Sequence, residues 1–292
     1  PQPAPVSPTR HVTIVDVSPR DGLQNEKAVL PVAAKVALVD ALTAAGVPII
    51  EVTSFVSPKA IPQLADAEQV MAGITRRAGT RYTVLVPNER GYDRALPTRP
   101  DGIVVFAAAS ETFSQKNINC SIAESMERFR PVVARAKSDG VQVRGTVSCA
   151  LGCPYEGEIA PSAVRDVAAR LLDLGVDELS IADTIGVGTP AKTSAVFAEV
   201  LTLVDASRVN AHFHDTYQRA LVNLEACLAL GVRSIDASAA GLGGCPFAPG
   251  ATGNVATESV LRMLAAQGYE TGVDVEAVQM AGAAVRSALA KA

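Results

Sequence analysis

The sequence predicts a (β/α)8 TIM barrel with extra helices at its C-terminal end. Eight short runs rich in Val and Ile alternate with longer segments of helical spacing, which is the order of elements in a parallel α/β barrel. The length of 292 residues suits a single barrel, which typically takes roughly 250 residues. A doubly wound open sheet is the alternative, but no G-x-G-x-x-G motif follows the first run.

The eight predicted strands are all short and rich in Val and Ile. Strands of a parallel sheet have this character because they are buried on both faces. They are predicted at residues 11–19, 47–55, 81–87, 102–110, 141–150, 176–184, 208–216 and 232–241.

Several of the intervening helices carry their own start and stop signals. At the start of residues 121–137, Ser121 and Glu124 have the spacing of a capping box. Glycine, the usual helix stop, directly follows three further predicted helices. These three are residues 31–45, 161–174 and 220–230.

The chain shows no linker or break in composition that would divide it into two domains. Residues 1–10 are rich in proline and are predicted to be a flexible tail. Residues 11–292 are predicted to form one domain. It includes two C-terminal helices, residues 254–267 and 274–291, and we expect the second of them to pack against the end or the side of the barrel.

Composition excludes several classes of protein. With 26 basic and 30 acidic residues the net charge is −4, so the chain lacks the broadly basic surface expected of a nucleic-acid-binding protein. A 48% apolar content excludes general disorder. No apolar run approaches the ~18–20 residues that span a bilayer, so no membrane association is expected. An odd number of cysteines, five, and the lack of a secretory signal indicate a reducing compartment, and we expect the cytoplasm.

Polar side chains gather at the C-terminal ends of the predicted strands, where barrels of this kind carry their chemistry. They are Arg20, Asp21, Glu51, Ser110, Glu111, Ser148, Cys149, Asp183, Thr184, His212, His214 and Asp215.

The pair His212 and His214 is the most informative of these features. Residues two apart on a strand point to the same face, so both imidazoles should face the barrel interior and could bind one cation. A hydrogen-bonded pair of core histidines is the alternative. Asp21 is the obvious carboxylate to join them, and a mixed N/O donor set suits Mg²⁺ or Mn²⁺ better than a closed zinc site.

Two further features point to catalysis. Arg20 precedes Asp21 directly after a strand, where it either forms a solvated ion pair or offers positive charge to a developing oxyanion. Residues 241–250, GLGGCPFAPG, form a glycine- and proline-rich loop that could bring the Cys245 thiol over the barrel mouth. A plain turn with a buried cysteine is the alternative for this loop.

Seven motifs, in order along the chain, resemble those of the 3-hydroxy-3-methylglutaryl-CoA (HMG-CoA) lyase family. This family belongs to the metal-dependent TIM-barrel lyases and Claisen-type synthases. The motifs are DVSPRDGLQNEK (16–27), TSFVSPK (53–59), KNINCSI (116–122), VSCALGCPYEG (147–157), DTIGVGTP (183–190), HDTY (214–217) and AGLGGCPFAPGATGN (240–254).

The resemblance implies an enzyme that cleaves a carbon–carbon bond by a retro-Claisen reaction, converting HMG-CoA to acetyl-CoA and acetoacetate. It implies a divalent cation, Mg²⁺ or Mn²⁺, an acyl-CoA substrate and a homodimer. The implied metal ligands are Asp21, His212, His214 and Asn254. The implied catalytic residues are Arg20 for the enolate oxygen, Cys245 of the loop, and the active-site acids Glu51 and Asp183.

The sequence also departs from the family pattern. It reads HDTYQRA where HDTYGQA is expected, with Gln218 and Arg219 at the two changed positions. Residues 96–100 and 107–109 differ as well, and such changes leave the acyl chain open. Three alternatives therefore remain: the same cleavage of another 3-hydroxy-3-carboxymethyl acyl-CoA, a Claisen-type condensing enzyme, and a barrel that binds metal and CoA esters without turnover.

Overall fold

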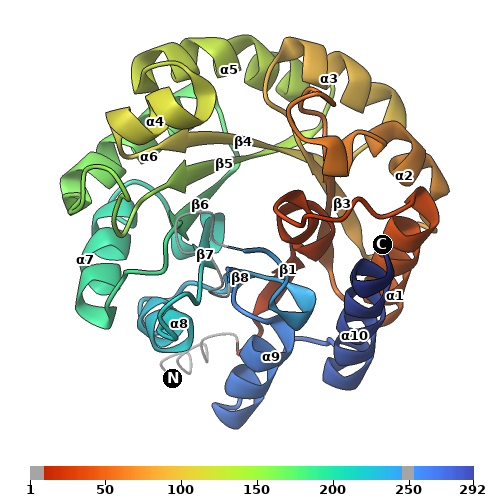
Figure 1. Cartoon of the computed structure of the whole chain (residues 1–292). Helices are drawn as coiled ribbons and strands as arrows, with labels where there is room; N and C mark the ends of the chain where they lie inside the picture. The colour runs from red at the N-terminus through yellow and green to blue at the C-terminus, as the bar shows by residue number, and fades with distance from the viewer. Residues whose placement is uncertain (1–9, 245–252) are drawn as a thin grey trace, which may run out of the picture.

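The computed structural model, described here for residues 10–244 and 253–292, confirms the predicted closed barrel of eight parallel strands (Figure 1). Each strand pairs with its neighbours in the sequence, and β8 pairs with β1 to close the ring. The strands are β1 (Thr13–Asp16), β2 (Ile49–Ser54), β3 (Arg81–Leu85), β4 (Gly102–Ala108), β5 (Gln142–Ser148), β6 (Glu178–Asp183), β7 (Val209–Phe213) and β8 (Ser234–Ala237).

Helices surround the barrel, as Figure 1 shows. The α-helices are α1 (Val32–Ala44), α2 (Ala67–Gly73), α3 (Glu89–Ala95), α4 (Glu111–Ile118), α5 (Ile122–Ser138), α6 (Pro161–Leu174), α7 (Pro190–Val200), α8 (Ala220–Ala229), α9 (Thr257–Ala266) and α10 (Val275–Lys291). Short 3-10 or π-helical turns are η1 (Ser18–Gly22), η2 (Pro62–Leu64), η3 (Leu96–Thr98), η4 (Ala206–Arg208) and η5 (Ala239–Gly241). None of the described helices is long and apolar enough to cross a membrane.

The predicted helix signals are confirmed. Ser121 and Glu124 form both hydrogen bonds of the capping box at the start of α5. Gly175 ends α6 with a φ of 103°, a left-handed conformation that favours glycine. The C-terminal extension packs on the side of the barrel, because α10 lies along α1 and against α9 (Figure 1).

All eight strands are shorter than the predicted runs, and the differences that bear on the site are those at the first strand and at the helix predicted from residue 254. The first strand ends at Asp16, whose carboxylate accepts hydrogen bonds from the backbone N–H and the hydroxyl of Ser18 and so supports a turn into η1. The helix predicted from residue 254 begins at Thr257, because the residues before it make bridges to the ends of β7 and β8. Both irregular stretches lie at the barrel mouth and carry predicted site residues.

The protein has an apolar core between the strands and the helices, and a second interior enclosed by the strands themselves. Outward-facing strand residues such as Ile14, Ile50 and Ile235 belong to the main apolar core under the helices. Inside the barrel, the small separate cluster of Val15, Val17 and Ile49 is apolar. Much of the remaining interior is polar or charged, which is costly unless every group has a partner.

Candidate active site

A cavity of about 400 Å³ opens at the C-terminal ends of the strands. One side is lined by charged or titratable side chains from η1, β2, β5, β7 and β8, and another by apolar side chains from β3, β4 and α4. The position is the one at which TIM barrels carry their active sites.

Asp21, His212 and His214 form a cluster in this cavity. Their potential ligand atoms all lie within 4.8 Å of one another. The Oδ2 atom of Asp21 is 3.8 Å from Nε2 of His212 and 4.0 Å from Nε2 of His214. The structure therefore brings together the two histidines of β7 and its end with the carboxylate of η1, as predicted.

Asn254 joins this cluster from the segment before α9. Its Nδ2 donates to Oδ2 of Asp21 at 2.7 Å, and its backbone bridges that of His214. The Asn254 side chain is almost fully buried, so it adds a fixed polar group beside the two imidazoles. All four predicted metal ligands are thus neighbours.

Arg20 lies between two carboxylates at the edge of the cluster. Its Nε donates to Oε1 of Glu51 at 2.5 Å, and its Nη1 donates to Oδ1 of Asp21 at 2.7 Å. Burial by itself would raise the pKa of Asp21, but Arg20 and the two imidazoles hold it well below its ordinary value. Asp21 is therefore an anion at neutral pH, as a metal ligand must be.

Two charged residues of the cavity were not predicted from the sequence. Asp236 on β8 accepts from Nδ1 of His212 at 2.9 Å, and Arg144 on β5 pairs with Asp236 at the same distance. Burial would raise the pKa of Asp236, yet Arg144 and His212 hold it below its ordinary value. The alternation of β8 could have flagged Asp236, since its neighbours Ile235 and Ala237 both belong to the outer core.

Asp183 lies outside the cluster. Its carboxylate is fully buried and accepts backbone N–H groups of Val187 and Gly188 at 3.1 and 2.9 Å. Burial raises its pKa to about 6 despite these bonds. These contacts hold the β6–α7 loop in shape. The predicted catalytic role of Asp183 stays a prediction.

The remaining strand-end residues are mostly engaged in local structure. Ser110 caps α4 by accepting from Phe113 N, and Glu111 accepts from the backbone of Ile122. Thr184 accepts from the backbone N–H of Cys149, whose own side chain is buried. Cys245, the predicted catalytic cysteine, lies outside the described residues.

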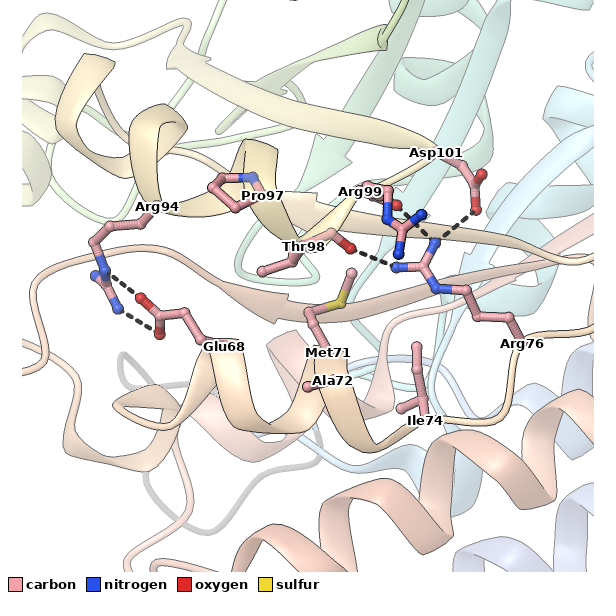
Figure 2. Close-up of a pocket in the computed structure, with 10 residues that line it drawn as sticks. All are labelled: Glu68, Met71, Ala72, Ile74, Arg76, Arg94, Pro97, Thr98, Arg99 and Asp101. Atoms are coloured by element: carbon pink, nitrogen blue, oxygen red, sulfur yellow. Dashed lines mark hydrogen bonds and ion pairs between the residues drawn. The ribbon is translucent and has the colours of Figure 1, made fainter.

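A larger hollow of about 870 Å³ lies on the outer side of the barrel, beside α2 and η3, and is a different place (Figure 2). Two of its arginines are already paired, Arg94 with Glu68 and Arg76 with the Thr98 and Arg99 carbonyls. None of the predicted site residues lines it. The smaller cavity at the barrel mouth is therefore the candidate active site.

The donor set fits a divalent cation. Two imidazole nitrogens and an anionic carboxylate oxygen converge, and an amide lies beside them. Such a set of nitrogen and oxygen donors suits a divalent cation. The fold and this cluster define a metal-dependent (β/α)8 barrel enzyme.

Comparison with known proteins gives the family. A family model described as HMGL-like matches residues 11–285, and the chain belongs to this family. It is 53% identical over 279 residues to "3-hydroxy-3-methylglutaryl-CoA lyase, cytoplasmic" of Danio rerio, covering 96% of this chain and 83% of that protein. The predicted carbon–carbon lyase class is confirmed at the level of the family.

Two bacterial relatives extend this result. The chain is 51% identical over 282 residues to "3-hydroxy-3-isohexenylglutaryl-CoA/hydroxy-methylglutaryl-CoA lyase" of Pseudomonas aeruginosa, covering 97% of this chain and 94% of that protein. The crystal structure of the HMG-CoA lyase from Brucella melitensis superimposes with a TM-score of 0.93 at 51% identity, covering 95% of this chain and 98% of that one.

Proposed function

We propose that this protein cleaves HMG-CoA to acetyl-CoA and acetoacetate with a bound divalent cation, Mg²⁺ or Mn²⁺. The observation that carries the proposal is the position of Arg20. It is fixed by Glu51 and Asp21 at the edge of the metal-ligand cluster, within the cavity at the barrel mouth. Asp21, His212, His214 and Asn254 would hold the ion.

The residues fit the steps that the reaction needs. The tertiary hydroxyl must lose its proton, and a divalent cation lowers the pKa of such a hydroxyl when the two are bound together. The bond between C2 and C3 then breaks, and its electron pair moves onto the thioester carbonyl as an enolate. A proton delivered to C2 completes acetyl-CoA, while C3 becomes the ketone of acetoacetate.

We propose that Arg20 stabilises the enolate oxygen. Its Nε and Nη1 are held by carboxylates and Gln24, while Nη2 has no hydrogen-bond partner among the described residues. A preorganised donor of this kind stabilises charge that develops in the transition state without having to reorient. Cys245 is proposed to deliver or accept a proton from its loop, with Glu51 setting the orientation of Arg20.

A product assay tests the proposal. Metal-loaded protein is mixed with HMG-CoA, and acetyl-CoA and acetoacetate are measured by mass spectrometry, with Cys245→Ala in parallel. Stoichiometric formation of both products, much slower in the variant, supports the proposal. Folded, metal-loaded protein that forms no product contradicts it and favours the non-catalytic alternative, whereas consumption of acetyl-CoA with an oxo acid reveals a condensing enzyme.

A substrate with a longer apolar group at C3 is a second candidate. Charged side chains line one side of the cavity, but Leu85, Val104, Phe106 and Phe113 line it elsewhere. The Pseudomonas aeruginosa relative carries an isohexenylglutaryl substrate in its name. Comparing kcat/KM for HMG-CoA and 3-hydroxy-3-isohexenylglutaryl-CoA decides between the two, because one added methylene in an apolar pocket is worth about 1–3 kcal/mol.

Assembly and compartment complete the proposal. We propose a homodimer, which light scattering on the purified protein tests directly. We also propose a cytoplasmic location, as in the name of the Danio rerio relative, although the name of a Bos taurus relative places it in mitochondria.

A further inference from the structure

We propose that Asp236 is a positioning residue that presents Nε2 of His212 to the metal ion. The inference rests on the metal site of the proposed function and assigns a role to a residue outside the four ligands.

The first contact joins Asp236 to His212. The two residues are register partners on the parallel strands β7 and β8, and their side chains meet with Oδ2 2.9 Å from Nδ1. An ionised carboxylate only accepts hydrogen bonds, so Nδ1 must carry the proton. The neutral ring then has its lone pair on Nε2, the nitrogen that faces Asp21 at 3.8 Å.

The second contact joins Asp236 to Arg144. Nη1 of Arg144 lies 2.9 Å from Oδ1 of Asp236, and both side chains are almost fully buried. A carboxylate in such a place needs a compensating charge. Arg144 supplies it from β5 on the far side of the barrel, and Nη2 of the same guanidinium is held by Glu178 at 3.1 Å. Asp236 is thereby fixed on both of its oxygens.

The third observation is the contrast with His214. Its Nδ1 is buried and has no hydrogen-bond partner among the described residues. Only one of the two imidazoles is therefore oriented by a carboxylate. Since such partners fix the tautomer and ring orientation of metal-binding histidines, the effect of Asp236 should fall on His212 alone.

The test uses Asp236→Asn, with Glu178→Gln as the matched control. Asparagine has nearly the same shape, but it can keep its Oδ1 toward Arg144 and turn its Nδ2 donor toward His212. The imidazole must then accept at Nδ1 and carry its proton on Nε2, where it blocks the metal. The control removes the other ion pair of Arg144 without touching His212.

Two readouts separate positioning from general stability. Nitrogen-15 NMR of the metal-free protein at alkaline pH reports which nitrogen of His212 is protonated. Titration with Mn²⁺, followed by electron paramagnetic resonance, gives the affinity. We expect an Nδ1–H tautomer in the wild type and in Glu178→Gln, an Nε2–H tautomer in Asp236→Asn, and a ~10–100-fold loss of Mn²⁺ affinity in Asp236→Asn only.

The outcomes are distinguishable. An Asp236→Asn variant that binds Mn²⁺ as tightly as the wild type overturns the role of Asp236 and leaves the proposed function intact. Wild-type protein that binds no Mn²⁺ overturns the metal site and this inference with it. If the variant does not fold, the spectrum of the wild type still decides, because an Nε2–H tautomer of His212 there contradicts the proposal.

Discussion

Asn254 and Asp21 are 233 positions apart in the sequence, yet the amide of one donates to the carboxylate of the other at 2.7 Å. The contact exists because β8 pairs with β1, so that the segment after the last strand meets the turn after the first. Closure of the barrel therefore assembles the candidate metal site.

Gly243 is predicted to control the position of Asn254. A Cβ at Gly243 would lie 2.7 Å from Nδ2 of Asn254, and the backbone there has a φ of 109°, which side chains rarely adopt. We expect Gly243→Ala to displace the amide, to lower Mn²⁺ affinity at least ~10-fold and to cost about 1–3 kcal/mol of stability. Gly244→Ala is the control, because no described atom lies within 4 Å of its Cβ position. Equal Mn²⁺ affinity for both variants would contradict the prediction.

Metal binding is predicted to stabilise the fold. Mn²⁺ at a free concentration of 100 times its Kd should raise the free energy of unfolding by ~2.7 kcal/mol, because the ion binds only the native arrangement of ligands. Thermal unfolding with and without EDTA measures this shift. His214→Ala should abolish it, and His11→Ala, at the exposed third histidine of the chain, should preserve it. A shift that survives in His214→Ala would place the ion elsewhere.

Arg20 is predicted to act on the chemical step. Its replacement by Gln keeps a donor but removes the charge, and loss of one preorganised oxyanion donor typically costs ~10²–10³-fold in kcat. Steady-state kinetics of Arg20→Gln should show this loss mainly in kcat, after circular dichroism has confirmed folding. Arg130→Gln removes an exposed arginine that pairs with Glu127 three residues before it, and should leave kcat unchanged. The assignment of Arg20 fails if the two variants behave alike.

Asp16 is predicted to make stability depend on pH. Burial raises the pKa of its carboxyl from 3.8 to about 6, although hydrogen bonds from Ser18 and Thr257 act in the opposite direction. At a pH between these two pKa values, the Asp16 carboxyl is mostly protonated in the folded state and mostly ionised in the unfolded state. This contribution is therefore complete below pH ~4 and is lost as the pH rises through about 6, by up to ~3 kcal/mol.

The variant Asp16→Asn does not titrate and should lack this loss. Urea unfolding of both proteins from pH 4 to pH 7 should show the variant gaining stability relative to the wild type as the pH rises. Parallel pH curves for the two proteins would show that Asp16 does not titrate in this range.

Gln218 is predicted to be a strained position. Its φ is 57°, a left-handed conformation that costs a non-glycine residue roughly 1–2 kcal/mol, and the family motif has glycine here. Gln218→Gly should therefore raise the free energy of unfolding by up to ~1 kcal/mol, after the entropy cost of glycine. Arg219→Gln restores the second family residue at a φ of −114° and should gain no such stability. A loss of stability in Gln218→Gly, measured by urea unfolding, would contradict this explanation.

Local patterns in the sequence were sufficient to predict the barrel. The eight apolar runs, the Ser121–Glu124 capping box and the glycine after residue 174 each follow from interactions within a few residues. The placement of His212 and His214 on one inward face follows in the same way, from the alternation of a strand. Asp21 was predicted from its position directly after a strand, whereas Asn254 was predicted only through the family resemblance, because no local pattern connects it with the other ligands.

The sequence by itself determined the strands, the helices, the inward histidines and the motifs of a lyase family. Only the tertiary structure decided which charges meet. It placed Arg20 between Glu51 and Asp21 and joined Asp236 to both His212 and Arg144. It also directed the carboxylate of Asp183 toward backbone N–H groups of the following loop. The physical reason is that a buried charge needs a partner at hydrogen-bond distance, and closure of the barrel, rather than spacing along the chain, supplies that partner.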